Sequence, residues 1–415
     1  MTSTKGRRTF IVGCGCTAFI KMGLEAATKA LLDAGITYDL IETAFVGHCY
    51  GDSTSGQRSL YNLGMTGIPI TNVNNNCATG GTALYQVNNC VKSGLVECAL
   101  ALGFERMAPG SLGTHFPDRP SPLAPFHNKT QELEQGMMAG TNFGPASKNH
   151  AHSMNNPYSQ FRNGWTVQQV LDSPKITKQL TKFMCSPTSD GAACCIVASE
   201  AFVHAHKLEN QAIEDYDPTS FESNSAMEVV GYSMTRRCAD KVFVQGGFAP
   251  GKGRDEIGVL ELHDCFAANE LIMYPALGLC APDAAHKMVD NGDNTYGGKY
   301  VVNPSGGLEA KGHPLGATGI GMNFYITRAG PMQAKALFNT LDKRGKYGLT
   351  HNIGIGGAVV VSLLRRPEFY TAGGIDGRSR LGYNHGHECR SIILADVEKV
   401  KSTKWSPYVL GRAKL

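Results

Sequence analysis

A single cysteine stands where a strand-like run passes into a helix-like run. Cys77 follows the apolar segment 68–74 and precedes 78–93, whose residue spacing predicts a helix that ends before Gly94. The unpaired N–H groups of a helix's first turn favour negative charge, so a thiol at this place readily becomes a nucleophilic thiolate. Buried structural cysteines are also common, and the chain has 13 cysteines, so the position alone does not decide between the two.

Three further motifs contain residues suited to acid–base chemistry. They are His263-Asp-Cys265-Phe, Gly-His313-Pro and His351-Asn-Ile-Gly354. An imidazole can accept a thiol proton, and a thiol near its own pKa can protonate a carbon acid. A purely structural histidine is less natural in the glycine-rich loop around His313. His263 could instead be a histidine satisfied at a strand end and Cys265 a core residue, and for His351 a structural role is at least as plausible as a functional one.

Composition excludes several classes of function. The chain is 42% hydrophobic and 18% charged, and its net charge of +4 comes without a long basic run, so nucleic-acid binding is not indicated. We expect no membrane span, since no apolar segment reaches about 18 residues, and no secretory signal. The odd number of cysteines and the absence of C-x-x-C spacing favour reduced thiols over disulfides or a metal site. The pair His150 and His152 is expected at the surface of a polar loop.

Strand-like and helix-like segments alternate along the chain, which predicts an α/β protein built on a sheet. Strands are expected at 9–12, 43–46, 68–74 (buried), 97–103, 192–198, 259–263, 300–303, 349–352 and 358–364, with a turn at 14–17 and the last two strands in a hairpin. Helices are expected at 24–34, 78–93 and 267–276. A strand, a glycine-rich turn and a helix occur at both Cys77 and His313, but this likeness is too weak to establish an internal repeat.

Two regions depart from the alternation. Prolines crowd the chain after residue 107, which predicts an excursion over 107–183 with short helices at 131–138 and 166–171 and a loop at 141–160. Such an excursion often forms a binding wall or lid, and disorder is the alternative.

The segment after residue 366 is polar and glycine-rich, without clear periodicity. Its last three residues, Ala413, Lys414 and Leu415, match the pattern of the Ser-Lys-Leu peroxisomal address.

Taken in order, Asn74–Gly81, the His263 motif, Gly312–Gly319 and the His351 motif resemble the thiolase superfamily, and in detail its sterol-carrier-protein type, over residues 8–365. The resemblance implies the thiolase fold, two similar α/β halves stacked as five αβαβα layers. We expect an N-terminal half at 1–220, a C-terminal half at 221–366 and a tail at 367–415. The tail is too short for a lipid-binding sterol-carrier domain.

The resemblance also implies roles for individual residues. Cys77 matches the nucleophile that takes the acyl group, and His313 matches the histidine that activates it and donates to the thioester oxygen. His263 matches the position that holds an oxyanion-hole water. The backbone N–H groups of Cys77 and Gly354 match a second oxyanion hole.

One position differs from most thiolases. Asn352 stands where they carry a late acid–base cysteine. In the sterol-carrier type that role passes to the cysteine of the His-Asp-Cys-Phe motif, which is Cys265 here. The roles of Asn352 and His351 are left undecided.

The implied activity is CoA-dependent thiolytic cleavage of 3-ketoacyl-CoA in peroxisomal lipid β-oxidation. The products are acetyl-CoA or propanoyl-CoA and a shortened acyl-CoA, formed through an acyl-Cys77 intermediate. The resemblance implies coenzyme A as a co-substrate, no permanently bound cofactor, and a homodimer with its contact near 77–103. It also implies import by the peroxisomal receptor that reads Ala-Lys-Leu.

Two other functions stay open. A ketoacyl-synthase-like condensing enzyme shares the fold and the cysteine nucleophile, but it uses two histidines for decarboxylation and has no need of Cys265. A non-catalytic thiolase-like protein would bind acyl-CoA or lipid without turnover. The segments after Phe19 and at 108–150 are shorter than the family's, which leaves the affinity for coenzyme A open.

Overall fold

The computed structural model describes residues 7–404 except 18–21, 108–117, 119–143, 177–179, 209–212, 217–229, 329–346, 355–356, 366, 369–380 and 384–388, and for 213–216 and 328 it describes the backbone alone. The helix predicted at 131–138 and the terminal residues Ala413, Lys414 and Leu415 lie outside the described residues. Within those ranges, no helix combines the length and the apolar character that crossing a bilayer requires.

Two sets of five strands repeat one layout. The described strands are β1 (Thr9–Thr17), β2 (Thr43–Gly47), β3 (Ile70–Val73), β4 (Cys98–Glu105), β5 (Gly191–Ser199), β6 (Ile213–Tyr216), β7 (Ile257–Glu261), β8 (Val301–Val302), β9 (Tyr347–Gly354) and β10 (Ala358–Arg365). Their order is β3-β2-β4-β5-β1-β6-β10-β9-β7-β8, so the second five mirror the first. In both sets the second strand pairs in parallel with the third and fourth, and the fourth and first pair antiparallel with the fifth. The structure therefore shows a repeat that the sequence was too weak to establish.

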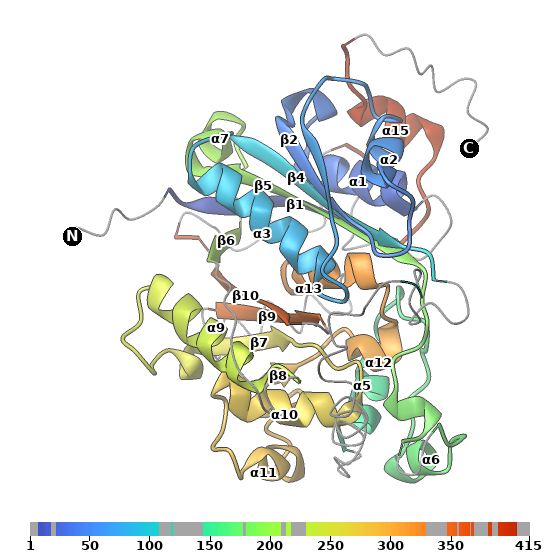
Figure 1. Ribbon diagram of the computed structural model, residues 1–415, viewed down its shortest axis with the longest axis vertical. Coiled ribbons are helices and arrows are strands. Elements are labelled where there is room, and N and C mark those ends of the chain that lie inside the picture. Colours follow the sequence, from blue (N-terminus) through green and yellow to red (C-terminus); the bar gives the residue numbers. More distant parts are fainter. Residues whose placement is uncertain are drawn as a thin grey trace.

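Helices complete five layers (Figure 1). One outer layer, on the first set of strands, contains α1 (Met22–Ala34), α2 (Ser55–Leu60), α7 (Glu200–Ala205) and α15 (Leu394–Val400). The central layer is α3 (Thr79–Lys92) and α13 (Leu315–Arg328), whose apolar faces meet strands of both sets. The other outer layer contains α9 (Tyr232–Gln245), α10 (Ala267–Leu277) and α11 (Ala285–Asp290). The alternation predicted from the sequence and the expected αβαβα layering are both confirmed.

Shorter elements lie beside these layers. They are α5 (Gly144–Ser153), α6 (Val167–Leu171), α12 (Gly307–Lys311) and the 3-10 turns η1 (Tyr38–Leu40), η3 (Lys182–Met184) and η4 (Arg254–Glu256). The helix predicted at 166–171 is present as α6, with Thr166 as its capping residue. The two predicted boundaries, at 220 and at 366, stay predictions.

Glycines allow the two central helices to approach each other closely. A Cβ atom at Gly80 would lie 2.7 Å from the carbonyl oxygen of Gly316, and one at Gly319 would lie 2.2 Å from the backbone nitrogen of Gly81. No real Cβ contact is that short, so larger residues would force the helices apart. The close crossing brings the first turn of α3 next to the first turn of α13.

Two expectations about strands were wrong. The predicted turn at 14–17 is the second part of β1, which pairs with β5 and is buried throughout. Its glycines serve packing, since a Cβ atom at Gly15 would lie 2.1 Å from the carbonyl oxygen of Ala26 in α1. The segment expected as a buried strand at 68–74 is the edge strand β3, which is only half-buried.

Two polar segments fold more than their composition suggested. The loop expected at 141–160 contains α5, and His150 and His152 on it are buried rather than at the surface. His150 Nε2 is hydrogen-bonded to Phe183 O at 3.1 Å, and both ring nitrogens of His152 are bonded, Nδ1 to Asn303 O at 2.9 Å and Nε2 to Thr295 Oγ1 at 2.8 Å. The tail contains α15 and the fully buried Tyr383.

Candidate active site

Cys77 sits in a tight turn between β3 and α3. The residue before it, Asn76, has a φ of 49°, in the left-handed region that non-glycine residues seldom adopt. The turn is tied down by hydrogen bonds from Ala78 N to Asn75 O and from Thr79 N to Asn76 O, both of 3.0 Å. The thiol is thereby placed at the amino end of α3, where the free N–H groups of the first turn stabilise negative charge.

Three reactive side chains meet at this turn. One ligating atom from each of Cys77, His263 and His313 lies within 4.8 Å of the others. The two imidazole rings stand edge to face, with centroids 4.9 Å apart. The three groups come from the turn before α3, the loop after β7 and the loop before α13, and all are buried. The structure thus brings together three of the four residues that the sequence singled out as catalytic.

The hydrogen bonds of His313 define which of its nitrogens can act as a base. Thr318 Oγ1 donates to Pro314 O at 3.0 Å, so it accepts a proton from His313 Nδ1 at 2.7 Å. The proton is therefore on Nδ1. Nε2 is buried with its lone pair available, and none of the described residues donates a hydrogen bond to it. Burial, assisted by the Lys311 ammonium, lowers the pKa of His313 to about 3. His313 is thus neutral near pH 7 and able to take a proton from a neighbour.

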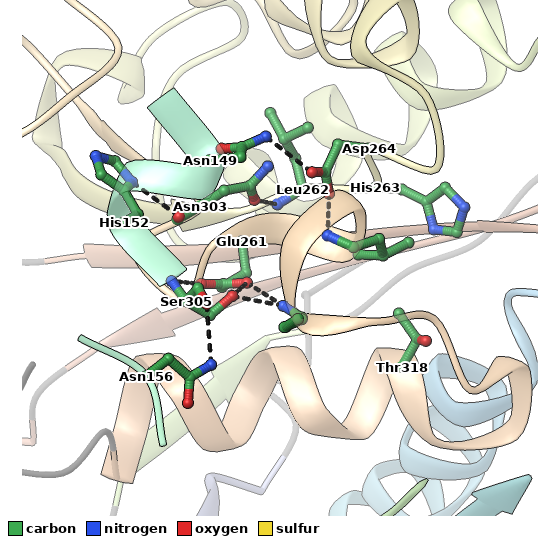
Figure 2. A network of polar contacts seen from close by, with 12 residues as sticks. Asn149, His152, Asn156, Glu261, Leu262, His263, Asp264, Asn303, Ser305 and Thr318 are labelled. Atoms are coloured by element: carbon green, nitrogen blue, oxygen red, sulfur yellow. Dashed lines mark hydrogen bonds and ion pairs between the residues drawn. The ribbon is translucent and has the colours of Figure 1, made fainter. Parts of the chain in front are cut away.

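Lys311 belongs to a buried network that fixes the His313 loop. Its Nζ donates to Glu261 Oε2 at 2.6 Å, and both side chains are at least nine-tenths buried. Glu261 also accepts from the backbone nitrogen of Ser305 at 2.9 Å and from its hydroxyl at 2.7 Å (Figure 2). An ion pair and hydrogen bonds to Ser305 therefore join β7, which carries Glu261, to the segment that leads to His313.

Asn352 connects the cysteine turn to His263. Its side-chain amide donates to Cys77 O at 2.9 Å and to His263 Nδ1 at 3.2 Å, and its oxygen accepts from Gly81 N at 3.3 Å. Since His263 Nδ1 accepts, the ring proton of His263 is on Nε2. Burial lowers the pKa of His263 well below its usual value, and the neighbouring His313 adds to this. Asn352, which the sequence left undecided, is an integral part of the cluster.

His351 is hydrogen-bonded to the backbone of His263, one of the three residues of the cluster. Its Nδ1 accepts from the backbone N–H of His263 at 3.4 Å, and its Nε2 lies 2.9 Å from the hydroxyl of Thr235. The ring is fully buried, and burial lowers its pKa to about 3. These contacts hold the backbone of His263 in place, which favours the structural alternative for His351.

Cys265 lies near the cluster but outside its tightest part. Its backbone oxygen accepts from Ser186 N at 2.9 Å, and the residue keeps some exposure. Burial of the thiol, then the charges of Cys77 and Asp264, raise the pKa of Cys265 well above its usual value. The thiol is therefore protonated near pH 7, as a general acid must be.

Asp264, between His263 and Cys265, turns away from the cysteine turn. It accepts from Asn149 Nδ2 at 2.9 Å and from Leu308 N at 2.7 Å. Figure 2 shows Asp264 directed toward Asn149 while His263 points away from this cluster. Burial raises the pKa of Asp264 well above its usual value. Asp264 thus anchors the motif and leaves its two neighbours to face the reaction centre.

Gly354 lies against the cysteine turn. A Cβ atom there would be 2.3 Å from Asn75 O and 3.0 Å from Ala78 N, so only glycine fits. The backbone of β9 therefore reaches the vicinity of Cys77, as expected of a pair of backbone amides that share one oxyanion.

Three supporting residues were missed by sequence reasoning. Thr318 orients His313, Asn149 holds Asp264, and the side-chain amide of Asn269 donates to His263 O. Thr318 could have been found, because it follows Pro314 by four residues in the first turn of a predicted helix, where its hydroxyl can return to the carbonyl of that residue. The two asparagines carry no such local signal.

One sulfur and two imidazole nitrogens are also ligands that zinc accepts. A zinc ion here would engage the lone pair of His313 and the thiol together. It would occupy the groups that proton transfer needs, so we expect it to inhibit rather than to assist.

Comparison with known proteins identifies relatives over most of the chain. Residues 12–163 match the family described as "Thiolase, N-terminal domain", and residues 219–356 match "Thiolase C-terminal domain-like". Sterol carrier protein 2 of Gallus gallus is 48% identical over 401 residues, which cover 86% of this chain and 71% of that protein.

Solved structures share the arrangement of elements. The structure titled "Ltp2-ChsH2(DUF35) aldolase" superposes with a TM-score of 0.70 at 18% identity, over 88% of this chain and 100% of that one. Human mitochondrial 3-ketoacyl-CoA thiolase in complex with CoA gives a TM-score of 0.62 at 15% identity, over 86% of this chain and 98% of that one. The chain has the thiolase fold.

Proposed function

Since the chain belongs to the thiolase family of acyltransferases, we propose that it cleaves 3-ketoacyl-CoA by CoA-dependent thiolysis through an acyl-Cys77 intermediate. The observation that carries this proposal is the placement of the Cys77 sulfur within 4.8 Å of nitrogens of two buried imidazoles, one of which, His313, has its Nε2 lone pair available. Coenzyme A acts as a co-substrate, as it does for the family, and no permanently bound cofactor is assigned.

The first half-reaction begins with proton transfer. His313 Nε2 takes the proton of Cys77, and the thiolate attacks the 3-keto carbon of the substrate. The oxyanion that forms at the 3-keto oxygen is stabilised by the backbone N–H groups of Cys77 and Gly354. At the thioester oxygen of the substrate, protonated His313 donates a hydrogen bond, and so does a water that the Nε2–H of His263 holds.

Carbon–carbon cleavage then follows. The bond between C2 and C3 breaks and its electron pair leaves as the enolate of acetyl-CoA, or of propanoyl-CoA from a 2-methyl substrate. The protonated thiol of Cys265 gives its proton to this carbon, and the acyl group stays on Cys77 as a thioester.

The second half-reaction reverses the proton flow. The Cys265 thiolate removes the proton of an incoming coenzyme A thiol, and the resulting CoA thiolate attacks the acyl-Cys77 carbonyl. The Cys77 thiolate leaves and takes its proton back from protonated His313, while Cys265 keeps the proton of coenzyme A. Shortened acyl-CoA is released, and both cysteines and His313 are in their starting protonation states.

The direct test follows the disappearance of acetoacetyl-CoA and of a longer 3-ketoacyl-CoA in the presence of CoA. Turnover is expected in the wild type and in the control variant Cys90→Ala. Cys90 lies on α3, the helix that follows the turn of Cys77. Turnover should vanish in Cys77→Ala. Binding of acyl-CoA without turnover in the wild type would overturn the proposal in favour of the non-catalytic binding protein.

A condensing enzyme is the second candidate, because the tight cluster consists of one cysteine and two histidines. Such an enzyme would decarboxylate malonyl-CoA and would not depend on Cys265. Release of CO2 from malonyl-CoA by the Cys265→Ala variant, without thiolysis by the wild type, would favour it.

Assembly and location complete the proposal. The homodimer contact is expected near residues 77–103, and we extend it to the adjoining edge strand β3, which is half-buried and precedes Cys77. Sedimentation of the wild type and of Thr71→Pro tests this assignment by comparing their oligomeric states.

We assign the protein to the peroxisome through Ala413, Lys414 and Leu415. A fluorescent fusion that loses its peroxisomal pattern without these residues tests the assignment.

A further inference from the structure

The tail is built into the core of the first half. Although it follows the region matched to the family, Tyr383 is 1% exposed and Val397 and Val400 are fully buried in the core between α1 and the first five strands. Ser402 N donates to Leu63 O at 2.7 Å, which holds the end of the described tail. The tail is therefore a structural part of the acyltransferase body.

Tyr383 makes a polar contact inside this core. Its hydroxyl lies 3.1 Å from the hydroxyl of Tyr158. The buried ammonium of Lys29 is 5.3 Å from the ring centroid of Tyr383 and 5.7 Å from that of Tyr158. Lys29 is held by Glu25 at 2.8 Å and by Cys16 O at 3.2 Å, so both rings pack on a fixed cation.

Tyr158 lies on the segment Asn156–Phe161, which supports the loop carrying His313. Asn156 Nδ2 donates to Ser305 O at 2.9 Å (Figure 2). Further along, Gln160 N donates to Lys311 O at 3.2 Å and Phe161 N to Ala310 O at 2.9 Å. The support segment is thus hydrogen-bonded to both ends of the stretch that leads into His313.

A side chain continues this contact to His313 itself. Ser189 Oγ donates to Gln160 Oε1 at 2.7 Å and accepts from the backbone N–H of His313 at 3.2 Å. The ring of Tyr158 also packs edge-on against Phe324 of α13, with centroids 5.7 Å apart. A continuous set of contacts therefore runs from the tail to His313, the general base proposed above.

We propose that Tyr383 is a positioning residue for the reaction centre: through Tyr158 and the segment Asn156–Phe161, the tail holds the His313 loop in its reactive geometry. The inference rests on the role proposed above for His313. It gives the tail a catalytic purpose that is separate from the terminal targeting residues. A small shift of a general base strongly lowers the catalytic rate, so residues that hold the base in position from a distance affect that rate.

The test compares three single variants, and the double variant of the two tyrosines, by melting temperature and by kcat and KM. It also compares the rate at which iodoacetamide alkylates Cys77, read from its peptide by mass spectrometry. Tyr383→Phe removes only the hydroxyl, and Tyr158→Phe removes its partner. Val397→Ala is the matched control, because it loosens the same tail without touching Tyr158.

We expect each tyrosine variant to lower kcat and the alkylation rate by about five- to tenfold, with KM for CoA nearly unchanged. The double variant should be no worse than either single one. Val397→Ala should lower the melting temperature and leave both rates at the wild-type level.

Tyrosine variants that lose only thermal stability, like Val397→Ala, would overturn the inference and leave Tyr383 as a core residue. Alkylation of Cys77 needs no substrate. A wild type without thiolysis, but with alkylation that responds to Tyr383→Phe, would therefore contradict the proposed function and leave the positioning role standing.

Discussion

The side-chain amide of Asn352 donates a 2.9 Å hydrogen bond to the backbone carbonyl of Cys77 across 275 residues of sequence. The same amide reaches His263, so one side chain of the second half sets both the peptide of the nucleophile and the ring beside it. This position carries a cysteine in most thiolases. By the resemblance to that family, an orienting amide stands here in place of a reactive thiol, and we assign the acid–base thiol to Cys265.

Replacing Asn352 by aspartate keeps the shape and removes both donated protons. It also places negative charge beside the Cys77 peptide, where the thiolate and the oxyanion must form. We expect kcat/KM for 3-ketoacyl-CoA to fall by roughly 100-fold or more, as for the loss of an oxyanion-site donor. Asn89→Asp, a half-buried position on α3, should stay near the wild type, and equal rates in the two variants would contradict the role of Asn352.

Removing the thiol of Cys265 separates the two cysteines in function. Cys265→Ala should lower kcat for thiolysis by roughly 100- to 10,000-fold, because the enolate then lacks its acid. Alkylation of Cys77 by iodoacetamide should continue at the wild-type rate, since His313 is untouched. Cys280→Ala, a half-buried cysteine after α10, serves as the control. A fully active Cys265→Ala variant would return the acid–base role to another group.

Buried neutral histidines make the fold sensitive to acid. The pKa of His351 is about 3 in the folded protein against 6.5 for an exposed histidine, so the unfolded chain binds more protons between these values. The stability it contributes is present above pH 6.5 and is lost as pH falls toward 3.

His351→Gln should therefore reduce the dependence of the free energy of unfolding on pH by up to about 1.4 kcal/mol per pH unit in this window. Urea unfolding at several pH values between 7.5 and 4.5 measures the slope. His204→Gln, whose side chain is half exposed, should leave the slope unchanged, and a His351→Gln slope equal to the wild type would contradict a neutral buried His351.

Glu309 gives the opposite dependence. It is fully buried on α12, and the nearby Asn149 amide donates its two protons to Asp264 and Glu270, so no described residue donates a hydrogen bond of good geometry to the Glu309 carboxyl. Burial, then the charge of Asp264, raise the pKa of Glu309 well above its usual 4.5. Its contribution to stability is complete below pH 4.5 and is lost as pH rises through the raised pKa.

Glu309→Gln copies the neutral carboxyl, so at pH 8 it should be more stable than the wild type by an amount of the order of 1 kcal/mol. The advantage should shrink toward pH 5. Glu398→Gln, on an exposed helix face, should show no such trend in the same urea titrations. A Glu309→Gln variant that is less stable than the wild type at pH 8 would show that the charged carboxylate is the native form.

The hydrophobic periodicity of the sequence and the placement of its glycines predicted most of the fold. The helix expected at 78–93 is α3 (Thr79–Lys92), which Gly94 follows with a φ of 78°, and β9 and β10 pair antiparallel as expected of a hairpin. Prediction failed where tertiary packing overrides local composition. The glycines of 13–17 serve close contact with α1, and the polar residues of α5 are satisfied by partners distant in the sequence.

The same distinction applies to the reaction centre. Cys77, His263 and His313 could be singled out because each occurs in a short motif of its own. Asn352 and Tyr383 could not be assigned, because their importance depends on side chains that lie hundreds of residues away and meet them only in the folded chain. Local sequence identifies reactive groups, whereas the groups that orient them depend on topology.

The reactive residues are divided unequally between the two sets of strands. Cys77 follows the third strand of the first set, whereas His263, His313 and Asn352 all come from the second. The nucleophile and the imidazole assigned to activate it therefore come from different halves, while the acid–base thiol of Cys265 belongs to the second. Deprotonation of Cys77 is thus coupled to the packing of the two halves, because it depends on a pair of atoms that meet only across their junction.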